Sequence, residues 1–101
     1  MPAAYLIVES NITDPEAFKR YMAAAPEVVK AFGGEYLVRG GRMQVLEGDW
    51  QPPRLTVLRY PSFEQAKAMY DSPAYTHARS LREGATACFN MVLVEGVEAP
   101  V

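Results

Sequence analysis

The chain has 101 residues, of which half are hydrophobic and 22% are charged. This composition is that of an ordinary globular domain, so intrinsic disorder is excluded and a single domain over residues 1–101 is expected. The formal net charge of −2 argues against a nucleic-acid-binding protein, because such proteins normally carry an excess of basic residues.

The cysteine content and the N-terminal segment bear on the cellular compartment. Cys88 is the only cysteine, so no intramolecular disulfide can form. The first apolar run stops at Glu9 and has no basic residue before it, unlike a secretory signal peptide. No segment approaches the roughly 20 apolar residues of a transmembrane helix. We therefore expect a cytoplasmic protein that does not contact a membrane.

The first third of the chain predicts a strand and a long helix. Residues 4–8 are a short apolar run with β-branched members, which is typical of a buried strand. Thr13 and Glu16 then have the spacing of a capping box, and apolar residues recur every three or four positions after them. Pro26 predicts a kink or a break in this helix. Gly33 predicts its end, because glycine readily adopts a left-handed conformation.

The middle of the chain predicts three further strands. Residues 36–39 and 43–47 are predicted to form a tight antiparallel hairpin around Gly40-Gly41. A loop over residues 48–53 follows, with two prolines and the only tryptophan, and residues 55–60 predict another strand.

The last part predicts two short helices and a final strand. Capping signals at Ser62 and Ser72 predict helices between Phe63 and Glu83 that meet near Asp71. Residues 89–95 predict a strand, and residues 96–101 a loose tail. The order β-α-β-β-β-α-α-β is typical of an α+β, ferredoxin-like split βαβ fold with an antiparallel sheet and both helical layers on one face.

Both faces of the predicted strands are apolar, although the helices can cover only one. One parity comprises Tyr5, Ile7, Val38, Met43, Val45, Leu55, Val57, Phe89, Met91 and Leu93, and the other Leu6, Val8, Leu37, Leu46, Leu58, Val92 and Val94. We therefore expect a second copy to cover the other face, in a homodimer with sheets packed face to face. A monomer closed by an unrecognised loop is the alternative.

Short segments spread over nearly the whole chain carry a family resemblance. They are Asp14-Pro15-Glu16, Tyr21, Gly33-Gly34, Arg39-Gly40-Gly41, Leu46-Glu47-Gly48-Asp49-Trp50, Tyr70-Asp71-Ser72-Pro73-Ala74-Tyr75, Arg82 and Val94-Glu95-Gly96. In these segments the chain resembles the domain-of-unknown-function 1330 family of the dimeric α+β barrel superfamily. The resemblance implies a ferredoxin-like monomer that pairs into a barrel of two sheets. It implies no reaction, because the relatives range from cofactor-free monooxygenases and isomerases to haem-degrading enzymes and proteins of no known chemistry.

The usual catalytic residue types are sparse. His77, the only histidine, is predicted at the border of a buried stripe formed by Ala74, Ala78 and Leu81. There it could act as a base, an acid or a haem ligand, or it could be a half-exposed surface residue. Cys88 is predicted as a small buried hydrophobe rather than a nucleophile. No zinc-ligand spacing and no phosphate-binding or serine-hydrolase motif occurs, so neither a metal nor a cofactor is expected.

Aromatic and basic residues are better candidates for ligand contacts. Tyr21 falls within the apolar arc of its helix, so its hydroxyl must find a partner or open into a cavity. Tyr75 and Arg82 are predicted at the other border of the last helix from His77, where packing at the helix edge is the simpler interpretation.

Two further sets of candidates lie on a loop and at strand ends. Trp50 and Arg54, in or next to the loop over residues 48–53, suit either a dimer contact or a ligand contact. Arg39 and Arg59 lie at strand ends and suit structural ion pairs or an anionic substrate.

Two classes of function follow from these residues. The first is a homodimeric small-molecule-binding or interaction domain without catalysis, which the lack of an acid–base pair favours. The alternative is a cofactor-independent enzyme, similar to a monooxygenase or an isomerase, that acts on a small aromatic or anionic compound. If a ligand binds, we expect a flat, weakly polar compound between helices and sheet, with Tyr21 and His77 as its polar contacts.

Overall fold

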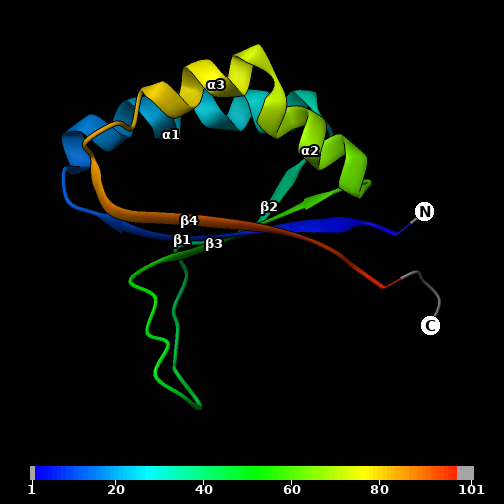
Figure 1. The fold of residues 1–101 in the computed structure, drawn as a ribbon. Coiled ribbons are helices and arrows are strands. Elements are labelled where there is room, and N and C mark those ends of the chain that lie inside the picture. Colours follow the sequence, from blue (N-terminus) through cyan, green and yellow to red (C-terminus); the bar gives the residue numbers. More distant parts are fainter. Residues whose placement is uncertain (1, 98–101) are drawn as a thin grey trace.

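A computed structural model describes residues 2–97 and contains a four-stranded antiparallel sheet with three helices on one of its faces (Figure 1). The elements in chain order are β1 (Ala4–Ile12), α1 (Pro15–Ala31), β2 (Glu35–Arg39), β3 (Leu55–Tyr60), α2 (Phe63–Asp71), α3 (Pro73–Ser80) and β4 (Thr86–Glu95). The strand order β2-β3-β1-β4 confirms the expected α+β, ferredoxin-like arrangement.

The sheet is organised around β1, which pairs in antiparallel fashion with β3 on one side and β4 on the other. Leu6 lies opposite both Leu58 and Leu93, so these three side chains share the face beneath the helices. Both outer ends differ from the prediction: β1 ends at Ile12 rather than at Val8, and β4 begins at Thr86 rather than at Phe89. Ser10 and Asn11 extend β1 because Phe89 and Cys88 pair with them, and pairing of this kind stabilises polar positions that local sequence does not mark as strand.

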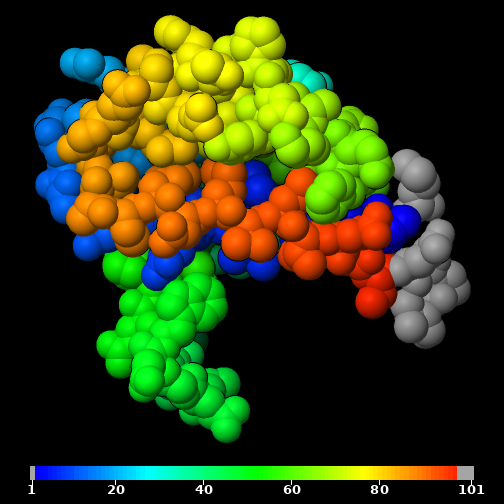
Figure 2. All heavy atoms as spheres, viewed as in Figure 1, coloured from blue at the N-terminus to red at the C-terminus, as the bar shows by residue number. Residues whose placement is uncertain are grey.

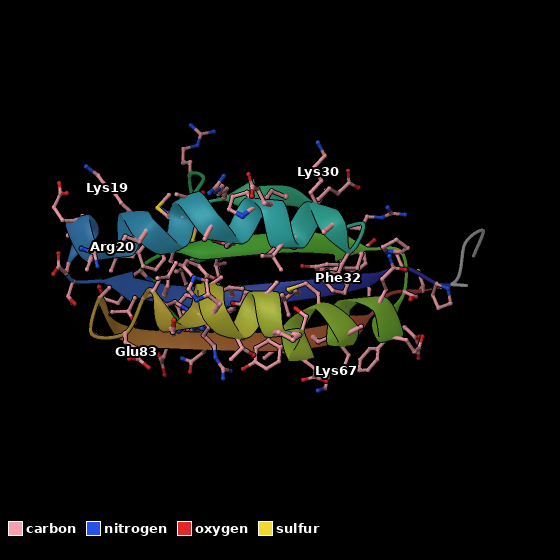
Figure 3. All side chains as sticks on the ribbon, turned by 90° about the horizontal axis from the view of Figure 1, so that it is seen from above. Lys19, Arg20, Lys30, Phe32, Lys67 and Glu83 are labelled. Atoms are coloured by element: carbon pink, nitrogen blue, oxygen red, sulfur yellow. The ribbon has the colours of Figure 1, made fainter. Side chains whose placement is uncertain are left out.

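The three helices form one layer, in which α1 runs beside the α2–α3 pair when the molecule is seen from above (Figure 3). The apolar face of α1 is buried through Phe18, Ala25 and Val29, while Lys19 and Lys30 are exposed on the side of α1 that faces away from α2 and α3 (Figure 3). α2 and α3 begin at the predicted caps: the backbone N–H of Gln65 donates to Ser62 Oγ, and that of Tyr75 donates to Ser72 Oγ, each at 3.1 Å.

One prediction about α1 is wrong, and another is resolved in part. The cap is Asp14, whose Oδ1 accepts from the N–H of Ala17 at 3.2 Å, whereas the Thr13 hydroxyl donates to the carbonyl of Ala85. The capping box therefore does not form, because Thr13 is used to join the helix start to the chain before β4. Of the kink or break predicted at Pro26, the break does not occur, because the helix is continuous from Pro15 to Ala31. Packing of Ala25 and Val29 on the core holds both sides of the proline in one helix.

The predicted hairpin around Gly40-Gly41 is wrong. Residues 43–47 form no strand, and β2 pairs instead with β3, fifteen residues farther along the chain. Residues 40–54, which we call the arm, leave the sheet on the side opposite the helices and turn back at a bend over residues 47–49 (Figure 1). Gly48 has φ of +84°, a conformation that favours glycine. A strand needs a hydrogen-bonded neighbour, and the two legs of the arm do not supply one to each other.

The sheet face opposite the helices is apolar and open, but its residues are not grouped as predicted. Because Ile7 lies opposite both Val57 and Val92, and Tyr5 opposite Val94, these side chains share the open face. Phe89, Met91 and Leu93 are therefore under the helices instead, packed on the core. The two faces of β4 were therefore assigned the wrong way round. Alternation divides the side chains of a strand between two faces, but only its pairing register with the neighbouring strands shows which of these faces lies under the helices.

The C-terminal end is described as far as Val97. Gly96 donates its N–H to the carbonyl of Ala3 at 2.8 Å, so the sheet contact continues one residue past β4. The rest of the predicted loose tail, residues 98–101, lies outside the described residues. No described helix is both long and apolar enough to cross a membrane.

Candidate functional site

A small cavity lies between the helices and the sheet, beneath α1. Its volume is about 50 Å³. Most of the side chains around it are apolar, and three of them are methionines: Met22 from α1, Met69 from α2 and Met91 from β4. The polar groups around it are the tyrosines Tyr21, Tyr36 and Tyr75, the arginines Arg39 and Arg54, and Ser10 and Thr56.

Two tyrosines from different helices meet at this cavity. The hydroxyls of Tyr21 on α1 and Tyr75 on α3 are 2.7 Å apart, and either can be the donor. Tyr75 is 1% exposed, and its ring packs against those of Tyr21 and Tyr70. A pair of hydroxyls has two protons and uses one between them, so one O–H and several lone pairs remain for a third group. The two hydroxyls therefore form a polar group within the mostly apolar wall of the cavity.

Two of the tyrosines at the cavity, Tyr21 and Tyr36, have a raised pKa. Burial raises the pKa of Tyr21 well above its usual value of 10, and the neighbouring Tyr75 raises it further. Burial also raises the pKa of Tyr36, against the opposing effect of the Arg39 guanidinium. Each hydroxyl can donate or accept a hydrogen bond, but neither of these two phenols supplies a phenolate base near pH 7.

Next to the cavity, the side chain of Arg82 packs against aromatic rings. The guanidinium of Arg82 lies 3.6 Å from the ring centre of Phe89 and 5.2 Å from that of Tyr21. Phe18 and Phe89 each contact the ring of Tyr21 as well. These contacts support the expected packing role of Arg82 and hold the Tyr21 ring in one orientation.

Two arginines from neighbouring strands stand at the cavity where the arm joins the sheet. Arg39 ends β2 and Arg54 comes directly before β3, and the N–H of Gly40 donates to the carbonyl of Leu55 at 3.0 Å. The guanidinium of Arg54 lies over Gly40, where a Cβ atom would come within 3.0 Å of Cζ. The φ of +70° favours glycine at position 40, and a side chain there would also displace the end of Arg54.

The cavity contains no obvious acid–base pair. Within the part of the chain that the structure describes, no carboxylate and no imidazole lines it. Nor do three His, Cys, Asp or Glu side chains come together as metal ligands anywhere in residues 2–97. The arrangement can therefore hold a small molecule by shape, hydrogen bonds and positive charge, and it offers no side chain suited to take up a proton near pH 7.

The structure does not bring His77 to the cavity beside Tyr21, where both were expected as polar contacts of a ligand. His77 is exposed and does not line the cavity. The buried face of α3 is formed by Tyr75 and Ala78, while Ala74 is exposed. The prediction followed the small apolar residues of this helix, but the large ring of Tyr75 buries more area and decides which face turns inward. The spacing of Tyr75, Ala78 and Arg82 could have shown this.

The other candidates lie away from the cavity. Trp50, on the arm, is 58% exposed, and its indole N–H donates to Glu9 Oε2 at 3.2 Å on the open face. Arg59 pairs with Glu35 at 3.4 Å, which is the structural ion pair expected as its simpler role. Cys88 is half-buried at the end of β4, across from Asn11.

Comparison with protein families assigns the chain. A model of the family described as a domain of unknown function, DUF1330, matches residues 3–97, and the chain belongs to this family. None of the curated proteins compared with the chain matches it by sequence.

Solved structures with the same fold share little sequence with the chain. The RPA0582 protein of unknown function from Rhodopseudomonas palustris has a TM-score of 0.75 and 16% identity, over 96% of this chain and 84% of that one. A dimeric ferredoxin-like protein of unknown function from Thermobifida fusca has 0.64 and 15%, over 94% and 92%. SnoaB, a cofactor-independent oxygenase from Streptomyces nogalater, has 0.67 and 8%, over 99% and 98%. At these identities the likeness shows the fold alone.

Proposed function

We propose that this DUF1330 chain is a homodimeric domain that binds a small, flat, largely apolar molecule in the cavity beneath α1. The observation that carries the proposal is the hydrogen-bonded pair of Tyr21 and Tyr75 hydroxyls beside that cavity. Burying hydroxyls in a helix–sheet core is costly unless they are satisfied, and apolar side chains would fill the same space at no such cost. The pair is suited to contact a bound molecule with its remaining O–H.

The cavity must enlarge to admit a ring. Its volume of about 50 Å³ is a fraction of the roughly 150 Å³ that accommodates benzene in an engineered apolar cavity. Met22, Met69 and Met91 line it, and methionine side chains repack at low cost because they are unbranched and flexible. We expect these three side chains to move aside when a ligand enters.

Methionine methyl signals provide a direct test of binding. With ¹³C-methyl methionine, single-ring aromatic fragments should shift the signals of Met22, Met69 and Met91 and leave that of Met43, on the arm, unchanged. Tyr21→Phe should weaken binding of hydroxylated fragments, and Tyr5→Phe, on the open face, is the matched control. Fragments that shift only Met43, or bind both variants equally, would contradict the proposed site.

The homodimer is supported by the open face and by one similar structure. Val92 is 61% exposed, Val94 44% and Leu37 51%, on the sheet face opposite the helices, which only the arm contacts within the described residues. The arm adds Leu46, 83% exposed, on the same side of the molecule (Figure 2). Exposed apolar groups over this extent are typical of protein–protein interfaces, and the Thermobifida fusca protein with this fold is described as dimeric.

The alternative of a cofactor-independent enzyme has the likeness to SnoaB in its favour. Because no carboxylate or imidazole among the described residues lines the cavity, such a reaction would need a substrate that ionises without help from a protein base. Incubating a bound fragment with the protein in air distinguishes the two proposed functions. Recovery of the unchanged fragment supports a binding protein, and an oxidised product that forms only with the protein supports an enzyme.

A further inference from the structure

Two arginines at the cavity keep most of their hydrogen-bond donors unused. The described residues contain three ion pairs, Lys19–Glu16, Arg59–Glu35 and Lys67–Asp71, and neither Arg39 nor Arg54 belongs to them. Each guanidinium has five N–H donors in a fixed plane. Arg39 uses one of its donors on the carbonyl of Met22, at a long 3.5 Å, and Arg54 has no hydrogen-bonded carboxylate in this part of the chain.

The backbone brings these two cations together. They are fifteen positions apart in sequence, but the antiparallel pairing of β2 with β3 places both at the same end of adjacent strands. Arg54 lies against Gly40, the neighbour of Arg39, and the guanidinium of Arg39 is held 4.6 Å over the ring of Tyr36. Two cations at the same end of neighbouring strands, both lining one cavity, favour an anionic ligand because an anion lowers the repulsion between them.

The cavity wall beyond the two arginines indicates what the uncharged part of the ligand should be. The cavity wall is made of apolar side chains and tyrosine rings, which favour a flat hydrophobic body. Its polar groups are therefore mainly of two kinds: cations where the arm joins the sheet, and the hydrogen-bonded hydroxyls of Tyr21 and Tyr75. A ligand that satisfies the cations must carry a negative group, and one that enters the apolar part must be thin.

We propose that the ligand of this cavity is a small planar aromatic carboxylate, whose carboxylate is bound by Arg39 and Arg54 and whose ring lies against the tyrosines. The assignment rests on the proposed binding function and specifies its chemical class. A carboxylate matches the planar fork of guanidinium donors and accepts from both arginines at once.

Benzoate and its neutral isostere benzamide test this class. Calorimetric or methionine-methyl titration of the full chain should give tighter binding of benzoate, by about 10- to 100-fold, because hydrogen bonds between charged groups contribute more than neutral ones. Arg39→Gln and Arg54→Gln should each remove most of this preference, because they lower the affinity for benzoate far more than the affinity for benzamide. Arg59→Gln is the matched control, since its guanidinium is used by Glu35.

The outcomes separate this class from the proposed function. Equal binding of benzoate and benzamide to the wild type would overturn the carboxylate assignment and leave the binding function in place. A loss of benzoate affinity in Arg59→Gln as large as in Arg39→Gln would also overturn it, because it would reflect overall charge. If neither compound nor any other aromatic fragment shifts the cavity methionines, both proposals fail. Circular dichroism confirms that each variant is folded, as expected for arginines that are exposed or half-buried.

Discussion

The two faces of the sheet have similar composition and different surroundings. On the helix side, Leu6 and Leu58 are 5% and 4% exposed. On the other side, Ile7 follows Leu6 in β1 and Val57 precedes Leu58 in β3, and Val92, which lies opposite Ile7 on β4, is 61% exposed. The chain supplies three helices to one face and only the arm to the other. The comparison shows that apolar residues on both faces of a sheet indicate that both faces need to be covered. The other elements of the chain then show how many of these faces one chain covers by itself.

The largest expected effect is on assembly through the open face. Val92→Asp should dissociate the proposed dimer, because the symmetry of the interface introduces two desolvated charges at a cost of several kcal/mol. Light scattering should then give the mass of one chain, 11.2 kDa, in place of twice that value. Ala23→Asp, at an exposed position on α1, is the control and should stay dimeric. A wild type that is already monomeric at micromolar concentration would contradict the dimer.

The next effect compares neighbouring residues on opposite faces. In a dissociated background such as Val92→Asp, Leu6→Ala should lower the free energy of unfolding by about 2–5 kcal/mol, because it leaves a hole in the core. Ile7→Ala should cost clearly less there, since its side chain is only partly buried within one chain. Urea denaturation measures both. Equal losses would mean that the open face is covered within the monomer.

Alkaline pH should act on the helix-covered side through its tyrosines. Burial raises the pKa of Tyr21 and of Tyr60 in the folded state above the usual 10. Above pH 10 the unfolded chain therefore loses protons that the folded chain keeps, so the stability present below pH 10 falls as the pH rises. The slope is at most about 1.4 kcal/mol per pH unit for each tyrosine. Denaturation at pH 9 and pH 11 should show a smaller loss for Tyr60→Phe than for the wild type.

The smallest effect compares two buried hydroxyls at neutral pH. Tyr21→Phe leaves the Tyr75 hydroxyl without its partner and should destabilise the fold by about 1–2 kcal/mol. Tyr60→Phe should be neutral or slightly stabilising, because the Tyr60 hydroxyl is buried with no protein hydrogen-bond partner among residues 2–97. Thermal unfolding of the two variants beside the wild type measures this difference. A destabilised Tyr60→Phe would indicate that a water molecule satisfies that hydroxyl.

The candidate site shows where local patterns are insufficient. Tyr21 was correctly placed in the buried arc of α1, because a long helix gives many positions to define its apolar face. α3 has eight residues, and its small apolar residues indicated a face that buried Ala74 and brought His77 to the cavity. The ring of Tyr75 decided otherwise. Arg39 and Arg54 were candidates for separate reasons, and only the pairing of β2 with β3 brought them to one place.

The sequence by itself determined the α+β class, the number and order of the helices, two of the helix caps and the two apolar faces of the strands. These features depend on contacts between residues close in the chain or on alternation within one strand. The tertiary structure alone decided that residues 40–54 leave the sheet as an arm, which set of β4 side chains faces the helices, and that Tyr75 is the partner of Tyr21. Each of these depends on register and packing between distant segments, because a strand takes its partner, and a side chain its neighbour, from the free energy of the whole fold.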